Sequence, residues 1–197
     1  MSSAPQYSLS YTTGAALIRE AVEVARLRNE LNSWPEVKKH VLENNTFQSR
    51  TVSTLKRMYG EVSRRLKHLT DDEIRLLAYG SEPEQKQLVW LAICKHYLLI
   101  RDFAQEVLVH QYKAARYAVN HDDYDAFFNA KAEWDDNIDG ASSTTKSKAR
   151  QVLFKMLREC GLVNEHGEIV QQQIDPILLG LLKRSEEGLN IYPGMEH

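Results

Sequence analysis

Lysine and arginine gather in two stretches of the chain, and their spacing suits the binding of a polyanion. Residues 46–67 include six basic residues and one acidic residue, Glu61. Residues 145–158 include five basic residues and no acidic residue. Phosphates form a dense line of negative charge along a duplex, and each Lys or Arg that contacts one releases counterions. The two stretches therefore predict nucleic-acid contacts, although the formal net charge of the chain is only -2.

A helix over about residues 49–68 would arrange the first group of cations in a row. Apolar residues recur at intervals of three and four and form one face: Val52, Leu55, Tyr59, Val62, Leu66 and Leu69. Arg50, Arg57 and Arg64 fall on the opposite side and repeat about every 10.5 Å along the helix axis. Because a glycine inside a helix costs about 1 kcal/mol relative to alanine, we expect Gly60 to mark the close approach of another backbone.

The helix before this one begins with a clear capping signal. Ser33 is the predicted N-cap, and Pro35 falls in the first turn, where a missing N–H does no harm. A turn near residues 43–46 then leads into the basic helix. Helix, short turn and second helix follow the order of a helix-turn-helix unit, whose second helix can lie in the DNA major groove.

The second basic stretch has a different context. Ser142 to Thr145 offer N-caps to a helix that ends near Cys160, with Lys148, Gln151, Lys155 and Arg158 opposite its apolar face. Two short apolar runs around His166-Gly167 then predict a β-hairpin over residues 162–170. Helix followed by hairpin is the order of a winged helix. The DNA-binding residues predicted from both stretches are Arg50, Arg57, Arg64, Lys146, Lys148, Arg150, Lys155 and His166.

Other kinds of chemistry have weaker support in the sequence. Residues 120–139 include seven acidic residues and one lysine, but their spacing does not match a calcium-binding EF-hand loop. The histidines are scattered, and no candidate acid, base or nucleophile has an activating neighbour. We therefore expect no metal, no cofactor, no small-molecule substrate and no enzymatic activity. Cys94 and Cys160 lie among apolar neighbours, which favours buried, reduced thiols in a cytoplasmic protein.

The predicted fold is mainly α, because glycine and proline are rare and leave long stretches unbroken. We expect two helical subdomains: residues 1–83 with helix-turn-helix character, and residues 84–197 with a winged-helix-like end and one small hairpin. Residues 79–83 are the predicted linker, and a loose tail is expected after a helix over about residues 176–184. The longest apolar stretch, residues 88–100, is too short to span a membrane, and no signal peptide is recognisable.

Several motifs spread over nearly the whole chain resemble the BrxA family of BREX bacteriophage-exclusion systems. The most specific is residues 44–51, Asn-Asn-Thr-Phe-Gln-Ser-Arg-Thr, followed by Thr54, Arg57, Glu61 and residues 64–66. The other matching segments are Tyr7-Ser8-Leu9, residues 14–17 with Glu20, residues 34–37, residues 85–88, residues 101–103 with Glu106, residues 145–153, and Leu157 with residues 160–162.

This resemblance implies a cytoplasmic accessory protein of phage defence that has no catalytic residues. It implies an all-helical fold with helix-turn-helix or winged-helix character and binding of double-stranded DNA, in the company of other BREX proteins. The family has also been compared with an RNA-binding antitermination fold, and some of its labels describe an inner-membrane protein, which the short apolar stretch argues against. Two alternatives stay open: an adaptor that assembles defence proteins, and an RNA-binding protein.

Overall fold

The computed structural model describes residues 7–185 and 188–195, apart from the side chains of residues 12 and 13, and is built almost entirely of helices. In chain order the elements are the 3-10 helix η1 (Ser10–Thr13), α1 (Ile18–Leu31), α2 (Trp34–Glu43), α3 (Val52–Leu66), α4 (Asp71–Tyr79), α5 (Glu82–His96), α6 (Leu98–Phe103), the π-helix η2 (Ala104–Val109), α7 (His110–Lys113), α8 (His121–Ala132), α9 (Asp136–Asp139), α10 (Ser143–Glu159), α11 (Pro176–Leu182) and the 3-10 helix η3 (Gly188–Ile191). The prediction of a mainly α fold is confirmed.

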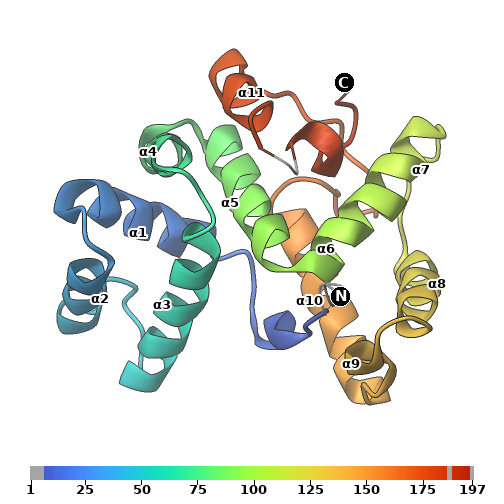
Figure 1. Cartoon of the computed structure of the whole chain (residues 1–197), viewed down its shortest axis with the longest axis horizontal. Helices are drawn as coiled ribbons and strands as arrows, with labels where there is room; N and C mark the ends of the chain where they lie inside the picture. The colour runs from blue at the N-terminus through green and yellow to red at the C-terminus, as the bar shows by residue number, and fades with distance from the viewer. Residues whose placement is uncertain (1–6, 186–187, 196–197) are drawn as a thin grey trace, which may run out of the picture.

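Helix α5 lies at the centre of the molecule. Figure 1 shows α1 to α4 on one side of it, and α7 to α10 on the other. Seven consecutive residues, 88–94, are buried, so α5 is apolar on all sides, as expected for a helix surrounded by others. The indole Nε1 of Trp90 donates a hydrogen bond to the carbonyl oxygen of Ile191, at 3.1 Å. This bond ties the centre of the core to the C-terminal segment.

Ser33 and Ser142 cap their helices as predicted, and Thr51 is an N-cap that was not predicted. The hydroxyls of Ser33, Thr51 and Ser142 accept hydrogen bonds from the first turns of α2, α3 and α10. Thr70 and Glu73 form a complete capping box at α4. Helix starts are fixed locally because a side-chain oxygen satisfies a backbone N–H that has no partner inside the helix.

The start of α3 corrects part of the sequence prediction. Thr51 is the N-cap, so Arg50 lies before the helix and does not continue the row formed by Arg57 and Arg64. Val52, expected on the apolar face, is 65% exposed because it lies in the first turn, beyond the helices that cover the rest of that face. A Cβ built on Gly60 would meet no other atom within 4 Å, so the expected close backbone approach is wrong.

The C-terminal region also differs from the prediction. The hairpin over residues 162–170 is not confirmed: residues 163 and 169 form one isolated antiparallel bridge, and Glu168 forms another with Ala118. The tail is not loose over its described part. Tyr192 is fully buried, and its hydroxyl donates to the carbonyl oxygen of Gln87 at 2.8 Å. Apolar burial of Leu189, Ile191 and Tyr192 therefore holds this segment against α5.

The predicted linker is short and packed. Only Gly80 and Ser81 separate α4 from α5, and the predicted boundary after Pro83 falls in the first turn of α5. Buried residues from both sides of this point belong to one hydrophobic core. The division into two subdomains stays a prediction. Its boundary lies in the first turn of α5, where the residues on both sides pack into one core.

The cysteines and the apolar helices bear on two further predictions. Cys94 and Cys160 are buried thiols rather than disulfide partners, and burial raises the pKa of the Cys160 thiol to about 12. In the described part of the chain, none of the helices combines the length and apolar character needed to cross a bilayer.

Candidate nucleic-acid interface

The outer face of α3 presents two of the predicted cations. Arg57 is exposed and forms no ion pair within the described part of the chain. The side chain of Arg64 is 58% exposed, and one of its guanidinium nitrogens lies 2.6 Å from Oε2 of Glu61. Arg64 therefore keeps an accessible edge while a carboxylate holds its position.

Glu61 is the centre of a buried polar network under this face. Its other oxygen, Oε1, accepts from the Arg65 guanidinium at 2.7 Å and also from the Tyr97 hydroxyl. Burial alone would raise the pKa of the Glu61 carboxyl, but the charge of Arg65 and the hydrogen bonds from Tyr97 and Arg64 outweigh it and lower the pKa. The carboxylate is therefore charged, and it orients both arginines.

Arg65 connects this network to the N-terminal segment. Its Nη1 donates to the carbonyl oxygens of Ala15 at 2.8 Å and Ala16 at 3.2 Å. The side chain is only 3% exposed. In the sequence, Arg65 is one of the six cations of the first basic stretch. In the structure, the contacts of Arg65 make it a buried anchor for residues 15 and 16.

Helix α10 carries the second exposed row. Lys148, Gln151, Lys155 and Arg158 are all exposed, and Ala149, Val152, Met156 and Leu157 are buried, as the helical spacing predicted. Lys155 lies 3.7 Å from Glu159, and the other oxygen of Glu159 accepts from the backbone N–H of Ala16 at 2.7 Å. Arg65 of α3 and Glu159 of α10 thus hold the same short segment, which joins the two basic helices.

The inner flank of α10 has a different environment. Arg150 lies 2.5 Å from Oδ2 of Asp125 on α8, and its side chain is 24% exposed. Lys146 lies 4.0 Å from Asp125, donates to the side chain of Asn129 at 2.6 Å, and lies 5.1 Å from the ring centroid of Phe128. Two of the predicted DNA-binding cations are therefore engaged with α8, a partner from the acidic stretch of the sequence.

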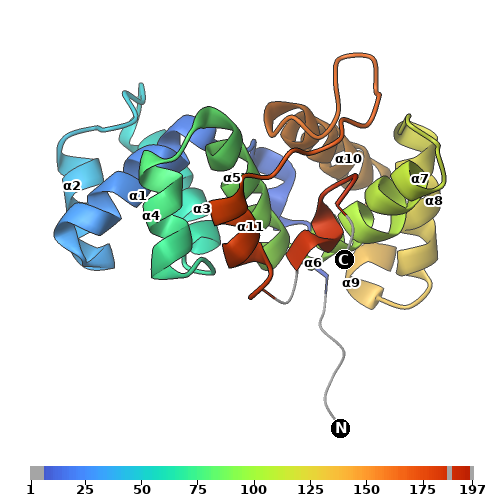
Figure 2. The same cartoon turned by 90° about the horizontal axis from the view of Figure 1, so that it is seen from above.

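His166 and Arg50 both lie in exposed connections. Asn164 organises the turn that contains His166, because its side-chain oxygen accepts from the backbone N–H groups of His166 and Glu168, each at 2.9 Å. Gly167 has a φ of 82°, a conformation that favours glycine at this turn. Figure 2 shows the segment after α10 and the connection between α2 and α3 projecting on the same side of the molecule.

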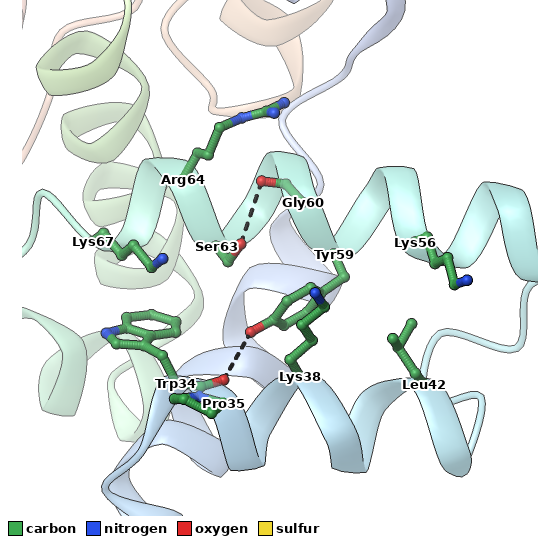
Figure 3. Close-up of a pocket in the computed structure, with 10 residues that line it drawn as sticks. All are labelled: Trp34, Pro35, Lys38, Leu42, Lys56, Tyr59, Gly60, Ser63, Arg64 and Lys67. Carbon is green, nitrogen blue, oxygen red and sulfur yellow. Dashed lines mark hydrogen bonds between the residues drawn. The ribbon is translucent and has the colours of Figure 1, made fainter.

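A groove between α2 and α3 was not predicted from the sequence. It has a volume of about 790 Å³, and we name it the basic groove. Its apolar surface comes from Trp34, Leu42 and Tyr59, and its charge from Lys38, Lys56, Lys67 and Arg64. The Nζ of Lys67 lies 5.8 Å from the Trp34 ring centroid, and the Tyr59 hydroxyl donates to the Trp34 carbonyl oxygen at 3.2 Å. Figure 3 shows Arg64 pointing away from α2.

The sequence does carry a signal for this groove. Lys56, Gly60, Ser63 and Lys67 are spaced by four, three and four residues, so they share one flank of α3. Gly60 leaves that flank without a side chain, which keeps the space open. This row was not predicted, because the predicted cationic face rested on the seven-residue spacing of the arginines.

Taken together, the fold and these surfaces define a small all-helical protein with two cationic helices joined through its N-terminal segment. The sequence profile of the BrxA family matches residues 5–186. The chain belongs to the BrxA family, which confirms the resemblance noted in the sequence.

Individual proteins agree with this assignment. The chain is 28% identical over 162 residues to a "BREX protein BrxA" from Bacillus cereus (strain H3081.97), covering 82% of this chain and 81% of that protein. It is 25% identical over 154 residues to a "BREX protein BrxA" from Escherichia coli O9:H4 (strain HS), covering 77% and 71% respectively. A crystal structure of an uncharacterized protein from Magnetospirillum magneticum is similar in fold, with a TM-score of 0.82, 20% identity and coverage of 95% and 97%.

Proposed function

We propose that this protein is a non-enzymatic, cytoplasmic component of a BREX phage-defence system that binds double-stranded DNA through its backbone phosphates. Membership in the BrxA family and the names of the two relatives support the role in defence, and make other BREX proteins its natural partners. The observation that carries the DNA proposal is the pair of exposed cationic helices, α3 and α10, fastened to the same residues of the N-terminal segment.

The contacts we propose follow from exposure. Arg57 and Arg64 on α3, together with Lys148 and Lys155 on α10, present charge to solvent and are the main phosphate ligands. Arg50 and His166 lie in the two exposed connections and extend the same surface. Lys146 and Arg150 support it indirectly, because their pairing with Asp125 fixes α10 against α8. Contacts of this kind position a protein on a duplex without reading its sequence.

A mobility-shift titration tests the proposal. Wild-type protein is expected to bind duplexes of unrelated sequence with similar affinity, and binding should weaken steeply as salt rises. Arg57→Glu combined with Lys155→Glu should weaken binding to every duplex alike. Arg75→Glu is the matched control, since Arg75 is an exposed arginine on α4, 66% accessible, away from both helices.

Two results would overturn the proposal. One is a wild-type protein that does not bind duplex DNA at low salt. The other is equal loss of binding in the control and in the α3–α10 variant. If duplex RNA competes with duplex DNA on equal or better terms, the RNA-binding alternative replaces this one.

The adaptor alternative has its own structural support. Leu76 and Tyr79 of α4 and Ile177 and Leu181 of α11 line a second groove, of about 400 Å³. Tyr79 is 64% exposed and Ile177 is 68% exposed, and adjacent exposed apolar side chains are typical of protein-binding surfaces. Capture of another BREX protein after nuclease treatment, abolished by Ile177→Asp, would support an adaptor role. Capture that the substitution leaves intact would exclude this groove.

A further inference from the structure

An exposed tryptophan stands in an acidic loop at one end of the molecule. Trp134, between α8 and α9, is 88% exposed, the highest value among the large hydrophobic residues of the described chain. Glu133 beside it, and Asp136 and Asp139 of the short helix α9 that follows, are exposed and form no ion pair within the described residues. We name these four residues the acidic loop. A large aromatic side chain in water is costly, and such residues are enriched where proteins bind one another.

The basic groove has the complementary properties at the other end. Lys38, Lys56 and Lys67 are exposed, and no carboxylate in the described part of the chain pairs with them. The apolar surface between them comes from Trp34, Leu42 and Tyr59, and Figure 3 shows these side chains facing the space between α2 and α3. A groove of about 790 Å³ is wide enough to accept an indole ring flanked by carboxylates.

The two surfaces cannot meet within one molecule. Figure 1 shows α2 and α3 towards one end of the longest axis, and α8 and α9 at the opposite end. We propose that the acidic loop of one copy docks in the basic groove of a second copy, with Trp134 on the apolar floor and the carboxylates paired with the three lysines. This contact joins different surfaces of the two copies, so it repeats head to tail.

This contact meets the proposed DNA surface only at Arg64, which lines the basic groove. Arg64 points away from α2 (Figure 3), and Arg57 lies seven residues before it on the same flank of α3. Lys56 and Lys67 occupy the groove flank. A head-to-tail row of copies therefore leaves Arg57 and the exposed row of α10 uncovered. The inference goes beyond DNA binding and holds even if this protein binds no nucleic acid.

The interface is small, because one loop and one groove bury less than the roughly 1,200–2,000 Å² of a stable complex. We therefore expect reversible association that strengthens with protein concentration and weakens with salt, since its rim pairs are solvent-exposed. Sedimentation velocity on nuclease-treated full-length protein measures this directly. The weight-average sedimentation coefficient should rise with concentration at low salt, and the rise should disappear at high salt.

Three variants test which surfaces are used. Trp134→Ala should abolish the concentration dependence, whereas Tyr117→Ala, which removes another exposed aromatic side chain (54% accessible), should preserve it. Reversal of the groove, Lys56→Glu with Lys67→Glu, and reversal of the loop, Glu133→Lys with Asp136→Lys, should each give a monomer. Circular dichroism melts identify any variant that fails to fold.

Mixing the two reversed variants is the decisive arm. Each alone opposes like charges. In the mixture two pairings of opposite charge become available, the reversed groove with the reversed loop and the unaltered groove with the unaltered loop, so association should return. The proposal is overturned if wild-type protein stays monomeric over the whole concentration range. It is equally overturned if Trp134→Ala associates like wild type, or if two folded reversed variants remain monomeric when mixed.

Discussion

Helices α3 and α10 begin alike and differ in what lies against their flanks. Each starts at a hydroxyl N-cap, Thr51 or Ser142, and each turns a row of cations to solvent. On α3 the buried partner of the basic row is Glu61, a residue of the same helix. On α10 the exposed Lys155 likewise pairs with Glu159 of its own helix, but Lys146 and Arg150 on the inner flank are held by Asp125, which comes from α8. A carboxylate within the helix is visible in its own sequence, whereas one from another helix is not.

Lysine and arginine side chains have two different roles in this protein. The side chains of Arg65, Lys146 and Arg150 bind other parts of the protein and hold its helices and segments together. Those of Arg57, Lys148 and Lys155 are exposed and can bind a ligand. Residues of both kinds alternate within one stretch of sequence. Counting charge in a stretch therefore overestimates the charge that a polyanion can reach.

The largest expected effect comes from removing the buried anchor of α3. Arg65→Ala leaves the Glu61 carboxylate without its buried partner and the carbonyl oxygens of Ala15 and Ala16 without a donor. Breaking a buried ion pair typically costs about 3–5 kcal/mol of folding free energy. Arg64→Ala, which removes an exposed partner of the same carboxylate, should cost only about 0–1 kcal/mol. Urea unfolding distinguishes the two, and equal costs would contradict the assignment of Arg65 as the anchor.

A smaller effect is expected on α10. Arg150→Ala should lower the free energy of unfolding by about 1 kcal/mol, because its ion pair with Asp125 is partly exposed. Lys148→Ala, on the exposed row two residues earlier, should change it by less than about 0.5 kcal/mol. A double-mutant cycle with Asp125→Asn isolates the pair. A coupling energy near zero would show that Arg150 is as free as Lys148.

Much of the local structure follows from the sequence, because caps and helical spacing act over a few residues. Ser33, Ser142 and the exposed row of α10 belong to this class. The prediction that Arg50 lies in one row with Arg57 and Arg64 is wrong, because Arg50 comes before Thr51, the N-cap of α3.

Local sequence patterns do not show which residues, distant in the chain, come into contact in the folded protein. Asp125 covers Arg150 from 25 residues away in the chain, and Ile191 meets Trp90 across 101 residues. The hairpin prediction is not confirmed for a similar reason. The second apolar run pairs partly with Ala118, a residue far from the predicted turn.

The end of α3 should respond to pH, and the end of α10 should not. His68, just after α3, lies 3.0 Å from His96 of α5, and burial together with the charge of His68 lowers the pKa of His96. The His96 imidazole therefore binds a proton more tightly in the unfolded chain than in the folded protein. The stability contributed by neutral His96 is present above the unfolded pKa of about 6.5 and is lost as the pH falls through the lower folded value.

Hydrogen exchange measures this difference within one molecule. Amide protection in the last turn of α3 should decrease on acidification below a pH of about 6.5, and His96→Gln should remove that dependence. Amides in the last turn of α10, beside the buried Cys160 thiol, serve as the internal reference. A parallel loss of protection at both helix ends would show that the histidine pair is not responsible.

The most direct test of the central claim is the salt dependence of DNA affinity, followed by fluorescence anisotropy. Removing three phosphate contacts with Arg57→Ala, Lys148→Ala and Lys155→Ala should reduce the slope of log K against log salt by about 2–3. Lys146→Ala with Arg150→Ala should leave that slope nearly unchanged, because Asp125 and Asn129 already engage those side chains. An unchanged slope in the triple variant, or an equal reduction in the double variant, would contradict the account.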